Sequence, residues 1–321
     1  MWLKFLEGGI GLMNMDDDVV EIGETSVLSR KMGLGTNKVG KSDIYKDVKD
    51  ADGFGLVKKA IDSGMTTIDT AYAYGKGRSE EIIGDVIKHY DRSDIVIATK
   101  AAQDPERDYA INNSPEFLKK SVDQALERLK VDYIDIFYIH FPDKDTPKAE
   151  ALSALEDMRE ADKIKAIGVS NFTLDQIKEA NIDGFVDVVE DNYSLVHRNA
   201  EKELFPYLRE NNISFVPYFP LASGTLTGKY QASDYAKVPR FSKEEFGQIV
   251  TSLDPVKKIA AKYDATVTQL LLAWYMMDPD ISIVIPGART VEQVEQNAKS
   301  WDIHLSKEDY QAIDTAFSDF K

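Results

Sequence analysis

Three short apolar runs in this sequence each end in a side chain that can take part in proton transfer. Asp69, Lys100 and His140 follow directly on these runs, and Tyr74 comes five residues after Asp69. Such runs are typical of parallel strands buried on both faces, and in α/β barrels the carboxyl ends of these strands carry the active site. We therefore predict that the four side chains meet at one end of a barrel.

A tyrosine beside a lysine can act as a general acid near neutral pH. The phenol has an ordinary pKa of about 10, but an ammonium about 4 Å away at an effective dielectric of about 20 favours the phenolate by about 4 kcal/mol, or roughly three pKa units. Asp69 keeps Lys100 charged in a dry pocket. A neutral His140 can orient a carbonyl oxygen and strengthen its hydrogen bond as negative charge develops. This set predicts that Tyr74 protonates a carbonyl.

Each of these residues has a plainer explanation when it is taken alone. An aspartate at a strand end is more often a helix cap or a turn residue, and a single histidine is commonly a satisfied structural group. Lys100 could extend to solvent, Tyr74 could be ordinary wall packing, and Tyr72 could replace it as the polar aromatic. Their joint occurrence at neighbouring strand ends favours the catalytic interpretation.

Eight short runs rich in β-branched residues alternate with amphipathic stretches from about residue 30 onward, which is typical of βα units. The predicted strands are Lys31–Gly33, Thr67–Asp69, Ile95–Thr99, Ile134–Ile139, Ile164–Val169, Val188–Glu190, Ser214–Tyr218 and Ser282–Ile285. Predicted helices include Phe54–Ile61, Ser79–Ile87, Phe117–Leu129 and Leu204–Leu208. Start signals are Ser79 with its two glutamates, Ser114-Pro115 and Thr268, and a long irregular loop is expected from Gly224 to Phe246.

Eight βα units in one uninterrupted stretch predict an α/β fold, namely a single-domain (β/α)8 TIM barrel over residues 21–321. A doubly wound open sheet is the competing arrangement. Its dinucleotide fingerprint is missing, because Gly33-Leu34-Gly35-Thr36 lacks a third glycine at the required spacing. The closed barrel is therefore favoured.

The charge balance limits the partners that the protein can have. The chain holds 39 basic and 55 acidic residues, a net charge of −16, and no cysteine. Such a surface repels nucleic acid and anionic lipid, so neither partner is expected, and any anionic ligand needs a local basic cluster. No metal is expected. Without cysteine there is no disulfide or thiolate chemistry, which fits a reducing compartment.

The first twenty residues do not fit the barrel pattern. Glu7 and the glycines interrupt the early apolar stretch, and no cleavage site of small residues follows, so a signal peptide is not expected. We predict an N-terminal extension over residues 1–20, with Met13 or Met15 as an alternative start. No apolar run of about 20 residues that could span a bilayer is present. A cytoplasmic protein, monomeric or a weak homo-oligomer, is expected.

From about Glu21 to Phe317 the sequence resembles the aldo-keto reductases. DTAYAYGKGRSEEIIG (Asp69 to Gly84), ATK (Ala98 to Lys100) and YIHFPD (Tyr138 to Asp143) are similar to the segments that carry the family's catalytic residues. GVSNF (Gly168 to Phe172), YFPLASGTLTGKY (Tyr218 to Tyr230) and IPGARTVEQVEQN (Ile285 to Asn297) are similar to its cofactor-binding segments. The branch it resembles most is the bacterial general-stress and inositol-operon reductases.

The resemblance implies a barrel that binds NADPH/NADP+ and uses Tyr74, Lys100, Asp69 and His140 as its catalytic residues. The cofactor-binding residues that it implies are Gly35, Thr36, Asn37, Ser170, Asn171, Glu190, Tyr218, Pro220, Leu221, Ser223, Gly224, Leu226, Lys229, Gly287, Arg289, Gln293, Gln296 and Asn297.

Several of these residue types suit a dinucleotide for physical reasons. The ring of Tyr218 at a strand end could stack on nicotinamide, although a core aromatic is an equally good explanation from the residue alone. Ser170 and Asn171 offer donors and acceptors for the carboxamide. The loop Leu221–Lys229 can bring backbone N–H groups and one ammonium to a pyrophosphate. Arg289 offers a rigid fork for a 2′-phosphate, which favours NADPH over NADH.

Two positions depart from the family's usual pattern. Glu190 stands where the family usually has a glutamine that contacts the carboxamide, and Asp191 follows it. A carboxylate can still accept the amide N–H, but the local charge differs. Gln293 stands where many members carry a phosphate-binding arginine, so Arg289 is expected to carry most of the 2′-phosphate interaction.

The predicted function is NADPH-dependent, reversible reduction of small aldehydes or ketones to alcohols, with Tyr74 as general acid. One alternative is a regulatory subunit that binds NADPH and senses redox state with little turnover. A second is a retaining glycosidase that uses carboxylates such as Asp69 and Glu190, since barrels host many such enzymes. Lys100 and His140 at the strand ends suit a glycosidase poorly.

Overall fold

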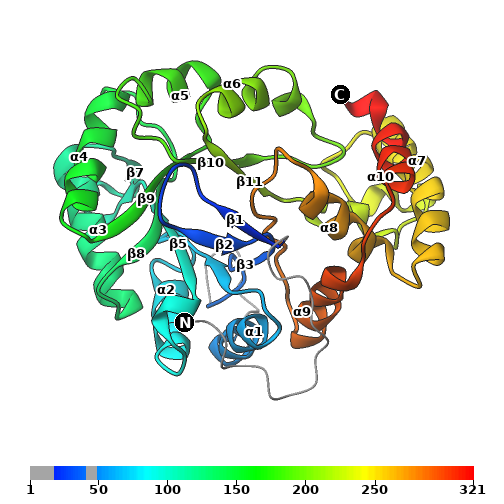
Figure 1. Cartoon of the computed structure of the whole chain (residues 1–321), viewed down its shortest axis with the longest axis horizontal. Helices are drawn as coiled ribbons and strands as arrows, with labels where there is room; N and C mark the ends of the chain where they lie inside the picture. Colours follow the sequence, from blue (N-terminus) through cyan, green and yellow to red (C-terminus); the bar gives the residue numbers. More distant parts are fainter. Residues whose placement is uncertain (1–17, 41–48) are drawn as a thin grey trace.

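The computed structural model describes residues 18–40 and 49–321. Within these residues, seven parallel strands form one sheet in the order β11-β10-β9-β8-β5-β4-β3. Their bounds are β3 (Gly33–Gly35), β4 (Thr67–Asp69), β5 (Val96–Ala101), β8 (Ile134–Ile139), β9 (Ile164–Ser170), β10 (Val188–Asn192) and β11 (Ser214–Tyr218). Helices surround this sheet (Figure 1). The predicted α/β barrel is confirmed, and the strand bounds differ from the prediction by at most two residues at either end.

The eighth predicted strand, Ser282–Ile285, is wrong as a regular strand. The segment still occupies the eighth place, because Ser282 N–H donates to the carbonyl of Phe215 in β11, and Val284 forms an isolated parallel bridge with Met32. A second bridge joins Gly287 to Gly35. Pro286 lies between the bridges and has no amide hydrogen to donate, so the ladder is interrupted there. These contacts nearly close the barrel.

Alternation along the strands decides which side chains reach the barrel interior. A buried apolar cluster inside the barrel joins Val96 and Ala98 of β5, Ile136 and Tyr138 of β8, and Val188 of β10, together with Ala166, Val216, Ile283 and Ile285. Successive side chains of a strand point to opposite faces of the sheet, so every second residue points into the barrel. At the carboxyl ends of β5, β8 and β10, the next residues in this alternation are Lys100, His140 and Glu190.

A β-hairpin closes the amino end of the barrel. It consists of β1 (Val19–Glu21) and β2 (Leu28–Arg30), which pair antiparallel, and its turn residues Ile22 and Val27 join the interior cluster. In Figure 1 this dark blue hairpin lies across the middle of the ring of strands. Most of the predicted extension, residues 1–17, lies outside the described residues. Residues 19 and 20, at the end of the predicted extension, belong to strand β1 of the hairpin instead.

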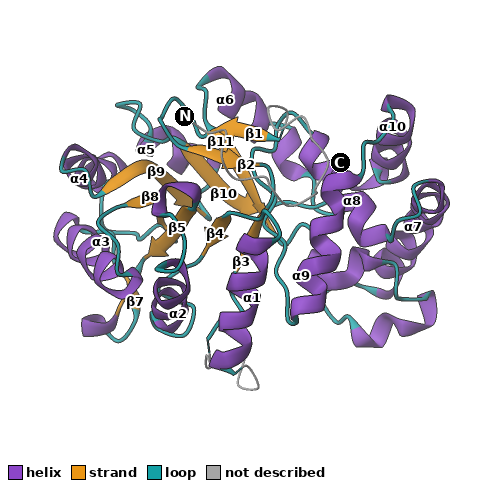
Figure 2. Ribbon diagram, turned by 60° about the horizontal axis from the view of Figure 1, so that its bottom comes forward, coloured by secondary structure: helices purple, strands orange, loops and turns teal. Residues whose placement is uncertain are grey.

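Helices follow the strands and bury their apolar faces against the outer side of the sheet. Their bounds are α1 (Asp50–Asp62), α2 (Arg78–Ile87), α3 (Pro115–Leu129), α4 (Lys148–Glu160), α5 (Leu174–Ala180), α6 (Leu204–Glu210), α7 (Lys243–Lys262), α8 (Val267–Met277), α9 (Val291–Ala298) and α10 (Lys307–Ala316). Helices α7 and α10 pack against each other beside the barrel (Figure 2). A short second hairpin, β6 (Gln103–Asp104) and β7 (Ala110–Ile111), follows β5.

The predicted helix starts are right in one case and wrong in two. Ser114 accepts a hydrogen bond from Phe117 N–H and Pro115 begins α3, as predicted. Ser79 does not begin α2, because the preceding Gly77 occupies the cap position in the left-handed region. Thr268 lies inside α8, which is capped by Thr266 with Gln269.

The predicted loop Gly224–Phe246 is not wholly irregular. A 3-10 segment ends at Thr227, a second one spans Ala232–Lys237, and α7 begins at Lys243. The signal for α7 was present, because Ser242 and Glu245 form a capping box.

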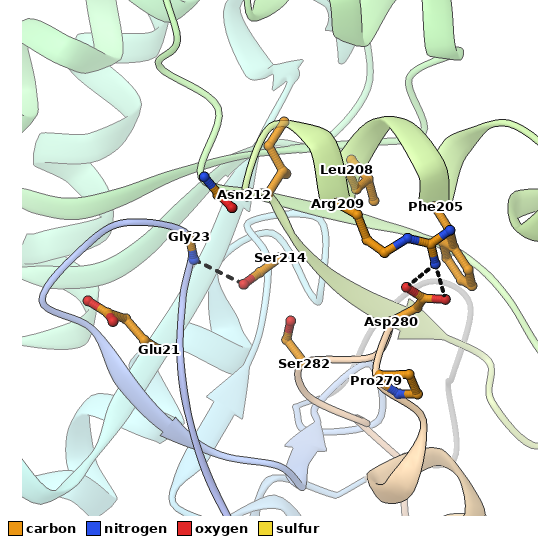
Figure 3. A pocket seen from close by; sticks show the side chains of 11 residues that line it. Glu21, Gly23, Phe205, Leu208, Arg209, Asn212, Ser214, Pro279, Asp280 and Ser282 are labelled. Carbon is orange, nitrogen blue, oxygen red and sulfur yellow. Dashed lines mark hydrogen bonds and ion pairs between the residues drawn. The ribbon is translucent and has the colours of Figure 1, made fainter.

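The amino end of the barrel also carries a small polar cavity of about 320 Å³ (Figure 3). Four residues of its wall pair with one another. Arg209 donates to both oxygens of Asp280 at 2.6 and 2.7 Å, and Gly23 N–H donates to Ser214 Oγ at 3.0 Å. Among the described residues, no helix is long and apolar enough to cross a bilayer.

The hairpin contributes to stability through its inward face. Ile22 is 0% exposed and Leu28, on the outward face, is 62% exposed. We expect Ile22→Ala to lower the free energy of unfolding by about 2 to 5 kcal/mol, because it leaves a cavity in the interior cluster. Leu28→Ala is the matched control, with an expected change below about 0.5 kcal/mol. Urea unfolding measures both, and equal effects would contradict the placement.

Candidate active site

Lys100 lies at the centre of the carboxyl end of the barrel and is completely buried. Its Nζ donates to Asp69 Oδ1 at 2.8 Å, to Asp69 Oδ2 at 2.6 Å and to the carbonyl of Thr70 at 3.0 Å. An ammonium has three N–H donors, so these bonds use all of them. The side chain is therefore fixed beside β4, as the predicted Asp69–Lys100 pair requires.

A second carboxylate, Glu190 of β10, reaches the same ammonium from across the barrel. Its Oε2 lies 3.1 Å from Lys100 Nζ, and its side chain is 3% exposed. Burial alone would lower the pKa of Lys100, but the carboxylates of Asp69 and Glu190 outweigh it and raise the pKa above its ordinary value. The amine is therefore held as a cation.

Tyr74 and His140 lie beside this ion pair. The ring centroid of Tyr74 is 5.8 Å from Lys100 Nζ and 6.3 Å from that of His140, with the two rings nearly perpendicular. Burial, with a smaller contribution from the Lys100 charge, lowers the pKa of His140 to about 3. The imidazole is thus neutral at neutral pH. The structure brings together all four residues that the sequence singled out.

A chain of buried hydroxyl groups holds the end of β4, where Asp69 lies, and the following loop, which carries Tyr74. Thr70 Oγ1 donates to Ser79 Oγ at 2.9 Å, Ser79 Oγ donates to Thr36 Oγ1 at 3.1 Å, and Thr36 Oγ1 donates to the Asp69 carbonyl at 2.7 Å. Ser79 therefore links α2 to the strand ends through hydrogen bonds and does not cap the helix. Ser79 N–H also donates to the carbonyl of Tyr74 at 3.1 Å, which fixes the backbone of the loop.

Glu80 holds the start of α2 from its other side. It is fully buried, and it accepts hydrogen bonds from Thr99 Oγ1 at 2.7 Å and from Arg128 Nε at 2.6 Å. The Arg128 guanidinium in turn lies 5.0 Å from the centroid of the Tyr72 ring. Glu80 was expected to help start the helix, but it pairs with α3 and β5 instead.

Three of the predicted carboxamide-binding residues form one hydrogen-bonded group. Tyr218 Oη donates to Asn171 Oδ1 at 2.8 Å, and Asn171 Nδ2 donates to Ser170 Oγ and to the carbonyl of His140, each at 3.0 Å. Asn171 adopts a positive φ of 61°. The Tyr218 ring is half-buried, so one part of it remains accessible for stacking.

A glycine lets β3 lie close against the eighth segment. A Cβ added at Gly35 would lie 2.9 Å from the carbonyl oxygen of Ile285, which no side chain tolerates. A Cβ added at Gly287 would lie 3.5 Å from Asn37 Oδ1. Close packing of β3 against the eighth segment therefore requires Gly35, whereas a side chain at Gly287 would make only an ordinary contact.

Three cations converge near this place: Lys38, Lys229 and Arg289. The half-buried Lys38 has a lowered pKa, first because of burial and then because the charges of Arg289 and Lys229 repel its own. Grouping like charges is costly unless a polyanion binds among them. Lys38 was missed in the sequence, although it directly follows Gly35-Thr36-Asn37, and its position there could have indicated it.

The remaining predicted cofactor residues lie on the loop after β11 and on α9. Leu221, Ser223 and Gly224 are partly or fully exposed, and Ser223 and Gly224 have positive φ angles of 55° and 93°. The side chains of Pro220 and Leu226 are buried in the loop's interior. Their side chains therefore do not face a ligand, and the carbonyl of Pro220 already accepts a hydrogen bond from Tyr275 Oη at 2.7 Å.

On α9, hydrogen bonds within the protein already use two of the predicted side chains. Gln293 Oε1 accepts from the Arg289 N–H at 2.7 Å, and Gln296 Oε1 accepts from Gln269 Nε2 at 3.1 Å. Asn297 is buried. Gln293 therefore fixes the backbone at Arg289, a residue that is itself exposed.

A family model described as "Aldo/keto reductase family" matches residues 31–317. The chain belongs to the aldo/keto reductase family. It is 32% identical to the "NADH-specific methylglyoxal reductase" of Escherichia coli, over 90% of this chain and 95% of that protein. Membership makes the protein an oxidoreductase, so the glycosidase alternative is wrong.

Two solved structures show the same fold over nearly the whole chain. The glycerol dehydrogenase AKR11B4 from Gluconobacter oxydans has a TM-score of 0.82 and 28% identity, covering 94% of this chain and 96% of its own. An aldo/keto reductase from Klebsiella pneumoniae, solved with NADP and acetate, has a TM-score of 0.72 and 26% identity, covering 94% and 95%. Family membership rests on the family model and on the relative that is 32% identical, and the general-stress and inositol-operon branch stays a prediction.

The Glu80–Arg128 pair gives a test of how the active-site loop is held. Truncating one partner of a buried ion pair leaves an uncompensated charge, so Glu80→Ala should lower the free energy of unfolding by about 3 to 5 kcal/mol. Glu81→Ala, which removes an exposed ion pair with Arg78, should cost less than about 1 kcal/mol. Chemical denaturation of both variants measures the difference. A Glu80→Ala effect as small as that of the control would show that the Glu80–Arg128 pair does not hold the loop.

Proposed function

We propose that this aldo/keto reductase reduces small aldehydes and ketones to alcohols with NADPH, and that Tyr74 donates the proton. The observation that carries the proposal is the buried Lys100–Asp69 pair with Tyr74 and His140 beside it at the carboxyl end of the barrel. A general acid needs a nearby charge that stabilises its conjugate base. Lys100 supplies that charge to Tyr74.

The described residues fit a nicotinamide dinucleotide. The converging cations Lys38, Lys229 and Arg289 suit its phosphates. At the carboxyl end of the barrel, where Lys100 lies, the hydrogen-bonded group of Ser170, Asn171 and Tyr218 offers a ring face for stacking and hydrogen-bond partners for an amide. When bound, the nicotinamide supplies a hydride to the carbonyl carbon.

The protein's own residues manage the carbonyl oxygen and its proton. His140 is neutral and can donate one N–H to the oxygen without adding charge. Tyr74 then gives its phenolic proton to the oxygen, and the negative charge left on Tyr74 is stabilised by Lys100. Asp69 keeps Lys100 protonated throughout. Alcohol oxidation is the reverse of these steps.

Replacing Tyr74 tests the proton donor. Tyr74→Phe should lower kcat for aldehyde reduction by about 100-fold to 10,000-fold and leave the Kd for NADPH nearly unchanged. The matched control is Tyr72→Phe, since Tyr72 faces Arg128 and should retain activity within about threefold. Steady-state kinetics and fluorescence titration give both quantities. A reversed outcome would make Tyr72 the donor.

Replacing Arg289 tests the cofactor preference, which matters because the Escherichia coli relative is named as NADH-specific. Charged hydrogen bonds contribute about 1.5 to 3 kcal/mol, so Arg289→Ala should weaken NADPH binding by roughly 10-fold to 100-fold. NADH lacks the 2′-phosphate and should lose less than about threefold. Lys229→Ala, near the expected pyrophosphate, should weaken both cofactors. An equal effect of Arg289→Ala on both would reject NADPH preference.

A further inference from the structure

One carboxylate oxygen of Glu190 has a charged neighbour but no well-aligned hydrogen-bond donor. Its Oε2 lies 3.1 Å from Lys100 Nζ, yet the three N–H groups of that ammonium go to the two oxygens of Asp69 and to the Thr70 carbonyl. Among the described residues, this buried oxygen has no hydrogen-bond partner. This oxygen therefore recovers less of the cost of losing its water than the two oxygens of Asp69 do.

The charges around Glu190 do not balance if both carboxylates are ionised. Lys100 on β5 is the positive group that faces it, and Asp69 on β4 already neutralises that charge. On β8, His140 is neutral, and burial raises the pKa of Tyr138 well above its ordinary value, so that phenol is neutral too. Burial also raises the pKa of Tyr218 on β11, to about 12. One net negative charge would therefore remain in a dry interior.

We propose that Glu190 is a positioning residue of the catalytic centre that holds its own proton during carbonyl reduction and thereby keeps the Lys100–Asp69 pair electrically balanced. The proposal rests on the proposed function, whose proton donor depends on Lys100. Asp69 is the carboxylate that stays ionised, because it alone receives two hydrogen bonds from the ammonium. Glu190 contributes a neutral acid group instead.

The direction in which the pKa of Glu190 is shifted agrees with this geometry. Burial and then the Asp69 charge raise the pKa of Glu190 well above its ordinary value, and Lys100 opposes them. A neutral carboxylic acid offers one O–H donor and one acceptor oxygen, whereas a carboxylate only accepts. Glu190 in its neutral form can therefore donate a hydrogen bond as well as accept one.

Loss of the Glu190 proton slows the reaction because it changes the charge beside Lys100. Ionised Glu190 adds a negative charge beside Lys100 and so weakens the stabilisation that Lys100 gives to the charge developing on Tyr74. The neutral form is present below the pKa of Glu190 and disappears as the pH rises through it. Carbonyl reduction should therefore slow with rising pH over that interval.

Infrared difference spectroscopy tests the proton directly. A neutral carboxylic acid has a carbonyl stretch separate from that of carboxylates, so the wild-type protein at neutral pH should show one that shifts when glutamate is labelled with ¹³C at Cδ. The signal should vanish in Glu190→Gln and persist in Glu127→Gln, which removes an exposed carboxylate on α3. The labelling arm uses wild-type protein and so does not depend on the folding of the variant.

The pH profile of kcat is the second readout. Wild-type kcat should fall as the pH rises through the raised pKa of Glu190, and Glu190→Gln should reduce that fall by about threefold or more. A signal that ignores glutamate labelling, or that vanishes in Asp69→Asn but persists in Glu190→Gln, overturns the proposal. If the protein reduces no carbonyl at all, the proposed function fails, and the infrared signal still decides where the proton lies.

Discussion

The ion pair between Lys100 and Asp69 is the interaction on which the rest of the site depends. Both side chains are buried at the carboxyl end of the barrel, where separating the charges would leave each without water. The pair is costly to bury, and three hydrogen bonds that the Lys100 ammonium donates offset that cost. What the pair provides is a fixed positive charge beside a phenol in a place where the effective dielectric is low.

The framework around the pair explains why it can stay fixed. Alternation along β5, β8 and β10 carries Lys100, His140 and Glu190 inward above an apolar layer, and the hairpin closes the opposite end. The room for Tyr138 in that layer comes from Gly168, since a Cβ there would lie 2.2 Å from the tyrosine ring. Buried hydroxyl groups and the Glu80–Arg128 pair then tie the active-site loop to the strands. Catalytic geometry and fold stability therefore share the same contacts.

The sequence predicted local features better than interactions across the barrel. Short apolar runs located β4, β8 and β11 with their observed bounds, because burial on both faces leaves a strong pattern. The four candidate catalytic residues were found because strand ends meet at one edge. The contact of Glu190 with Lys100 has no local signature, since it joins strands far apart in the chain. The same holds for Ser79 and Glu80, which resemble cap residues but pair with distant groups.

The most direct test of this account is the rate of hydride transfer in Lys100→Met, measured in a single turnover by the loss of NADPH absorbance. The account predicts a rate about 100-fold or more below that of the wild type, because Tyr74 loses the charge that stabilises its conjugate base, while the Kd for NADPH stays within about threefold. A variant that transfers hydride within about threefold of the wild-type rate would contradict the central role of the lysine.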